Sequence, residues 1–209
     1  MCLYGFKGVL HFYITIGGYM KIVAFNGSPR KNGNTQYLLE KILEPLKHEN
    51  FITEIVQIGG KEIRGCIACM GCAKNRDKFC SVKNDIFNDC MIKMLKADAI
   101  IIGSPVYFAN MTAEVKSLID RAGFVSFNNG GLFENKIGAA IAAQRRGGGV
   151  NVVESIYRMF LMSKMIIPGS TYWNFGNGLN KGEVEYDNEA VENMLDLGKR
   201  IAWLLKKIK

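Results

Sequence analysis

The sequence predicts a doubly wound α/β fold, with five parallel strands in one sheet and helices on both of its faces. Three observations predict it. From residue 20 onward, short apolar runs alternate with longer amphipathic segments. Most of the short runs are continuously apolar, which is typical of parallel strands buried on both faces. No repeat or linker divides the 209 residues, a length that suits one domain.

In the first half of the chain, the spacing of apolar residues predicts two strands and two helices. Residues 21–26 (KIVAFN) are a short apolar run typical of a buried strand, and residues 51–58 alternate with the period of a strand. Residues 34–47 and 85–96 bring apolar side chains back every three or four positions, which is the period of an amphipathic helix.

The second half continues the alternation. Strand, helix, strand, helix, strand and helix are expected in turn at residues 98–103, 111–121, 136–143, 150–162, 165–168 and 188–207. The first two of these strands are nearly unbroken apolar runs (DAIIIG and KIGAAIAA), and the third is the short run MIIP. The closing segment, 188–207, places its apolar residues at helical spacing, so this helix is expected to bury one face.

Residues 1–19 stand apart from this pattern. They are apolar and aromatic but are interrupted by glycines, Lys7 and His11, and they are too short and broken to predict a membrane span. They also lack the basic region and cleavage site of a signal peptide. We expect translation to begin at Met20, so that residues 20–209 form the domain; an added edge strand is the alternative for this N-terminal extension.

The charge balance excludes few classes of function or partner. Lys and Arg number 27 against 19 Asp and Glu, which gives a net charge of +8. A Lys-rich solvated surface explains this, although an acidic partner would also suit it. No helix-turn-helix, zinc-finger or RNA-recognition pattern is present, so nucleic-acid binding is not expected. No hydrolase motif is present either, and we expect no stable membrane insertion.

A polar loop between the first strand and the first helix has the composition of a phosphate site. Its sequence, GSPRKNGNT at residues 27–35, offers hydroxyls, a guanidinium and backbone N–H groups at the positive end of a helix. It is neither a Walker A loop nor a dinucleotide-binding G-x-G-x-x-G. The alternative is a plain turn in which Asn34 or Thr35 caps the helix. Ser28, Arg30 and Thr35 together favour the phosphate.

Two more loops follow later strands. The run SPVYF at residues 104–108 could form an apolar and aromatic wall against a flat ring. The run AQRRGGG at residues 143–149 combines two cations with glycines that permit close backbone approach. Because ligands of open parallel sheets bind beyond the carboxyl ends of the strands, we expect these loops and the phosphate loop to meet there.

Four cysteines in a short segment predict an iron–sulfur cluster. Their spacing is Cys66-x2-Cys69-x2-Cys72-x7-Cys80, and the crowded triplet resembles the bacterial ferredoxin run. Structural zinc usually uses two separated pairs, and disulfides suit small secreted chains, so both are disfavoured. An ordinary loop with nothing bound is the remaining alternative. We assign residues 60–84 as the cluster-binding loop and expect Cys90, outside it, to pack in the core.

The two stretches GSPRKNGNT and SPVYFANMTAEVKSLIDR resemble the NADPH-dependent FMN reductase superfamily, and specifically its iron–sulfur flavoprotein branch. The resemblance covers residues 20 to about 149 and implies a flavodoxin-like fold with FMN and a [4Fe–4S] cluster held by Cys66, Cys69, Cys72 and Cys80. For the FMN it implies contacts with Ser28, Arg30, Asn34, Thr35, Pro105, Val106, Tyr107, Phe108, Asn110, Gln144, Arg145, Gly147 and Gly148.

The function expected from these features is electron transfer in the cytoplasm of an anaerobe. The resemblance implies a homodimer or homotetramer, in which the cluster of one subunit lies near the flavin of its neighbour, and a ferredoxin-like donor is a candidate partner. Two alternatives stay open. One is an NAD(P)H-dependent FMN or quinone reductase without a cluster, and the other is a non-catalytic flavin- or nucleotide-binding module.

Overall fold

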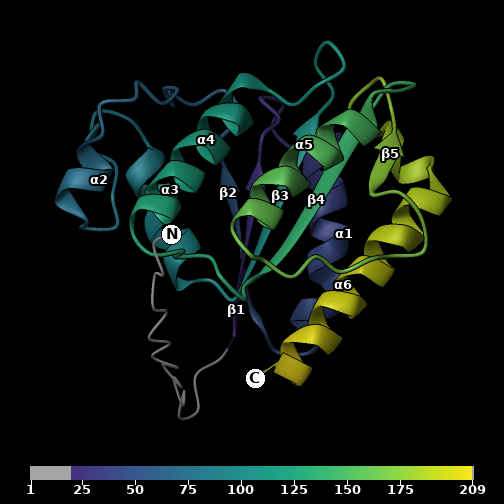
Figure 1. Ribbon diagram of the computed structural model, residues 1–209. Coiled ribbons are helices and arrows are strands. Elements are labelled where there is room, and N and C mark those ends of the chain that lie inside the picture. Colours follow the sequence, from purple (N-terminus) through teal and green to yellow (C-terminus); the bar gives the residue numbers. More distant parts are fainter. Residues whose placement is uncertain (1–19, 209) are drawn as a thin grey trace, which may run out of the picture.

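The computed structural model describes residues 20–208; the N-terminal extension and the expected start at Met20 therefore fall at or beyond the edge of the described residues. Five parallel strands form one sheet in the order β2-β1-β3-β4-β5 (Figure 1). This confirms the predicted fold class. The strands are β1 (Lys21–Asn26), β2 (Ile52–Gln57), β3 (Ala99–Pro105), β4 (Ile137–Gln144) and β5 (Phe175–Asn177).

Helices cover both faces of the sheet (Figure 1). One face carries α1 (Asn34–His48) and α6 (Asn188–Ile208). The opposite face carries α3 (Phe87–Lys96), α4 (Ala113–Asn128) and α5 (Gly149–Met162). The short helix α2 (Gly71–Asn75) lies in the cysteine segment, and a 3-10 turn, η1 (Glu183–Tyr186), precedes α6. Within residues 20–208, no helix has the length and apolar character needed to cross a bilayer.

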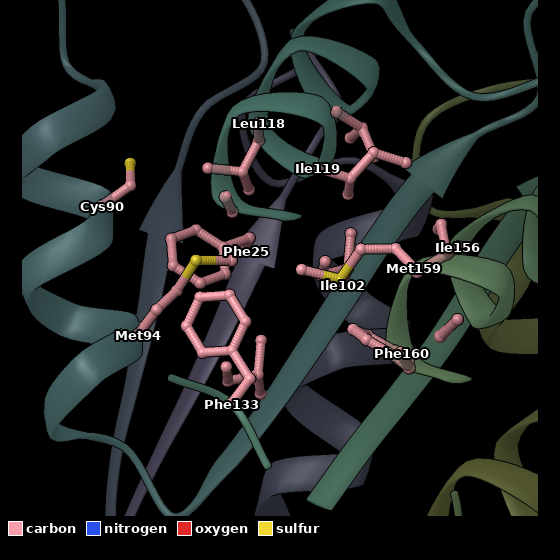
Figure 2. Packing of buried hydrophobic residues seen from close by; sticks show 14 of the residues in the cluster. Phe25, Cys90, Met94, Ile102, Leu118, Ile119, Phe133, Ile156, Met159 and Phe160 are labelled. Carbon is pink, nitrogen blue, oxygen red and sulfur yellow. The ribbon is translucent and has the colours of Figure 1, made fainter. Parts of the chain in front are cut away.

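Alternation along the strands divides the core into two layers. In β1, Ile22 and Ala24 pack under α1 and α6, whereas Val23 and Phe25 pack under the other three helices. Successive strand residues point to opposite faces, so a strand buried on both must be apolar throughout. Figure 2 shows the second layer, where Phe25 lies among side chains of α3, α4 and α5. Cys90 belongs to this layer and is 2% exposed, as expected.

The fifth strand is not where the sequence predicts it. In the run 165–168 only Ile166 pairs with the sheet, through an isolated bridge to Ile137. Pro168 has no N–H with which to continue a ladder, and Met165 is instead buried in the core. The strand β5 forms later, where residues 175–177 pair with the end of β4. Helix α4 also runs seven residues past its predicted end at Arg121 and buries Val125.

The strand order creates a crevice at one edge of the sheet. Asn26, at the end of β1, pairs in register with Gly103 of β3. From these neighbouring strands the chain leaves toward opposite faces, into α1 and into α4. The loops therefore diverge above the sheet, and such a switch point is where open α/β sheets bind ligands.

Candidate functional site

A cleft open to solvent lies above the ends of β1, β3 and β4. It brings together residues from all three loops that the sequence singles out. The lining residues are Ser28, Arg30, Asn34, Thr35, Pro105, Val106, Tyr107, Ala143, Arg145, Gly178, Leu179 and Lys181.

The phosphate-loop end of the cleft contains a buried hydroxyl without a partner. Helix α1 has Gly33 as its N-cap and no side-chain capping hydrogen bond, so the alternative of a plain turn capped by Asn34 or Thr35 is wrong. The Thr35 side chain is 1% exposed, yet its Oγ1 makes no hydrogen bond within the described residues. The first N–H groups of any helix also lack intrahelical partners. Together these groups fit a bound phosphate.

Asn34 connects the phosphate loop to residues 178–182, a wall of the cleft that has no counterpart among the predicted site residues. Its Nδ2 donates to the carbonyl oxygens of Gly178 and Asn180 at 3.1 and 2.9 Å, and its Oδ1 accepts from Gly182 N at 2.8 Å. Arg30 Nη1 donates to Leu179 O at 3.1 Å. The side-chain amide of Asn34 is therefore engaged by residues 178–182, and its contact with a phosphate stays a prediction.

The loop after β3 places only part of its predicted set in the cleft. Pro105, Val106 and Tyr107 line it. Phe108 is fully exposed and has a positive φ of 45°. Asn110 exchanges two backbone hydrogen bonds with Tyr107, at 2.8 and 3.0 Å, and lines a different pocket, beside α4. The roles of Phe108 and Asn110 in FMN binding remain predictions.

The loop after β4 is shaped by its glycines and by Gln144. Gln144 is buried, and its Oε1 accepts from Gly149 N at 2.8 Å while its Nε2 donates to Asn177 Oδ1 at 3.1 Å. Gly148 has φ +91°, and a Cβ there would lie 2.8 Å from Val106 Cγ1. Gly147 faces open space. Arg145 is the side chain of this loop that reaches the cleft.

The four cysteines line a second, smaller cavity. Cys66, Cys69, Cys72 and Cys80 all border it. The loop coils around it through left-handed residues at Ala68 and Met70, with φ of 52° and 57°. Cys72, on α2, is buried, and this burial raises the pKa of its thiol. Thiolate ligands drawn from one coiled segment fit an iron–sulfur cluster.

Disulfides and a single metal ion fit this cavity less well. The five cysteines within residues 20–208 are all unpaired. In the same part of the chain, no three His, Cys, Asp or Glu side chains converge closely enough to hold one ion. Zinc would require its thiolates at about 2.3 Å from a single point, whereas each iron of a cluster takes its own thiolate. Four unpaired thiols around one cavity are the donor set that a cluster requires.

Residues 20–180 match the family model of NADPH-dependent FMN reductases. The chain belongs to this family. Within it, the chain is 36% identical over 197 residues to an iron–sulfur flavoprotein of Methanocaldococcus jannaschii, covering 91% of this chain and 100% of that one. It is 33% identical to the iron–sulfur flavoprotein of Methanosarcina thermophila over 191 residues, covering 90% and 97%. The chain is thus a member of the iron–sulfur flavoprotein branch.

Solved structures of other sequences share the fold of this FMN reductase family member. A flavodoxin-type WrbA-like protein from Agrobacterium tumefaciens superposes with a TM-score of 0.64 at 15% identity, over 92% of this chain and 100% of that one. The Trp repressor binding protein from Bacillus subtilis gives 0.63 at 22% identity, over 84% and 98%. These likenesses show a flavodoxin-like fold.

Proposed function

We propose that this protein transfers electrons between an FMN bound in the cleft and a [4Fe–4S] cluster bound by Cys66, Cys69, Cys72 and Cys80. One observation carries the proposal: four thiols from one short segment border one cavity, in a chain whose β1/β3 crevice forms a second site. When bound, the cluster supplies one-electron steps and FMN couples them to two-electron chemistry. The protein holds both groups and tunes their potentials.

The cleft residues divide into phosphate and ring contacts. The N-terminus of α1, the Thr35 hydroxyl and the Arg30 guanidinium bind the phosphate, since each is a donor at the positive end of a helix. Pro105, Val106 and Tyr107 form one wall for the ring. Arg145 brings a positive charge to the cleft, which would stabilise a reduced, anionic flavin.

An apolar groove supports assembly into a homodimer or tetramer. The groove lies between α4 and α5, and Phe124, Met159 and Met162 are among its lining residues. Phe127 and Met162 are 79% and 83% exposed. Exposed aromatic and methionine side chains of this kind are enriched at protein interfaces. The net charge of +8 suits an acidic, ferredoxin-like donor, and the unpaired cysteines suit a reducing cytoplasm.

Anaerobic purification with iron and acid-labile sulfide analysis tests the proposal. We expect a flavin spectrum, a broad shoulder that bleaches with dithionite, and about four irons per chain, as a [4Fe–4S] cluster requires. Cys80→Ser should reduce iron content sharply, whereas the matched control Cys90→Ser should retain it, because Cys90 lies in the core. Flavin without iron or sulfide after reconstitution would contradict it, and NAD(P)H oxidation by such protein would support the cluster-free reductase.

A further inference from the structure

Arg121 of α4 is a buried cation with no place in the FMN cleft. Its side chain is 1% exposed, and the Asp85 carboxylate that accepts from its Nη1 is fully buried. Burial raises the pKa of Asp85, but hydrogen bonds from Arg121 and from two backbone N–H groups lower it by more than burial raises it. The pair is therefore ionised at neutral pH. Taking two charges out of water is costly, and a buried ion pair is often no more stabilising than apolar side chains of the same volume.

The guanidinium holds both ends of the cysteine segment. Nη1 donates to Arg64 O at 3.1 Å, just before Cys66, and Nη2 donates to Val82 O at 3.0 Å, just after Cys80. Asp85 adds a contact of its own, since its Oδ2 accepts from Arg64 N at 2.8 Å. The two chain ends that frame the cavity are therefore fixed to one planar group.

The Arg121 side chain has one more N–H donor, at Nε. Arg121 Nε is buried and has no hydrogen-bond partner, although a buried N–H without a partner is costly. Arg121 itself borders the cavity that the four cysteines line. The cation therefore lies beside the proposed cluster site, in the same cavity lining as Cys80.

We propose that Arg121 donates a hydrogen bond to a sulfur of the cluster site, the Cys80 thiolate or an adjacent sulfide, and thereby raises the reduction potential of the cluster. The inference rests on the proposed cluster. Reduction adds one electron and one negative charge to the cluster, and no bond forms or breaks. A cation held in a medium of low dielectric stabilises that added charge, and hydrogen bonds to the sulfurs act in the same direction. Asp85 partly offsets the effect.

Two substitutions with opposite effects on charge test this inference. Arg121→Gln removes the cation and should lower the cluster potential. Asp85→Asn removes the opposing carboxylate and should raise it. In each case we expect about a tenfold change in the ratio of oxidised to reduced cluster at fixed solution potential, which corresponds to about 59 mV for one electron. Arg121→Lys, which keeps the charge, should recover most of the lost potential.

The readout is a redox titration of anaerobically purified protein, with cluster reduction followed by electron paramagnetic resonance and the FMN potential as an internal reference. Loss of packing alone would shift both variants in the same direction, and this result, or an unchanged potential in both, would overturn the inference. If Arg121→Gln loses its iron, Asp85→Asn decides: an upward shift supports the inference and any other outcome overturns it. Wild-type protein without iron contradicts the proposed function instead.

Discussion

At the scale of single residues, a substitution at Thr35 should weaken FMN binding without destabilising the fold. Its hydroxyl is buried without a partner, so Thr35→Val should leave the stability of the flavin-free protein unchanged or slightly higher. FMN affinity should fall about tenfold, as losing a hydrogen bond of about 1.5 kcal/mol to a charged group predicts. Quenching of flavin fluorescence measures the affinity, and urea unfolding measures the stability.

The matched control is Thr112→Val. Thr112 Oγ1 donates to Gly27 O at 3.0 Å, so this buried hydroxyl has a protein partner. Removing it leaves a carbonyl unsatisfied, and the free energy of unfolding should fall by about 1–3 kcal/mol. Equal destabilisation by both substitutions, with FMN affinity unchanged in Thr35→Val, would mean that the Thr35 hydroxyl serves the fold.

Cys90 should be chemically silent although it follows the cluster loop. Burial raises the pKa of its thiol to about 12, with the charge of Asp89 adding to the effect. Because the thiolate is the nucleophile, only roughly one molecule in 10⁵ is reactive at pH 7. In cluster-free protein, iodoacetamide should therefore modify the exposed Cys66 and Cys69 and spare Cys90 until urea is added. Mass spectrometry of the peptides checks this, and native labelling of Cys90 would contradict it.

At the scale of elements, two helical glycines should respond oppositely to alanine. In α6, a Cβ on Gly198 would lie 2.2 Å from Ile42 O and 2.5 Å from Pro45 Cγ, so α1 and α6 would have to separate. Gly198→Ala should cost about 1–3 kcal/mol, as other overpacked sites do. In α4, a Cβ on Gly123 meets only Met159 Cγ, at 3.9 Å. Gly123→Ala should add about 0.5–1 kcal/mol through helix propensity. Chemical denaturation of both variants decides, and a stabilised Gly198→Ala would contradict the close packing.

Elements differed in how well the sequence could predict them. Strands β1, β3 and β4 are buried on both faces, so their apolar composition alone identifies them. Strand β5 has three residues, FGN, and is defined by its pairing with residues 142–144. No local sequence pattern indicates such a strand. The more apolar run at residues 165–168 is therefore the one that the sequence predicts as the fifth strand.

The candidate sites show the same distinction. The cysteine segment and the phosphate loop are local in sequence, so spacing and composition are enough to single out both as candidate sites. The wall at residues 178–182 depends on Asn34, which is 144 to 148 positions away in the chain. A contact of that range has no signature in the sequence of either segment. Phe108 has a positive φ and is fully exposed, and its predicted contact with FMN stays a prediction.

For the whole molecule, the α4/α5 groove predicts how copies associate. Phe127 and Met162 expose most of their apolar surface next to the groove, and a second copy would remove that surface from water. Phe127→Glu and Met162→Lys place charges where a partner would pack, and a desolvated, unpaired charge opposes association strongly. Each should convert the assembly to monomers with little change in the free energy of unfolding, since substitutions at exposed sites rarely affect stability by more than about 0.5 kcal/mol.

Trp203→Glu is the matched control, because Trp203 is 56% exposed on α6, across the sheet from the groove. Light scattering after size-exclusion chromatography gives the masses. A monomeric wild type would contradict the predicted association. Dissociation by Trp203→Glu alone would place the interface on the other face of the sheet.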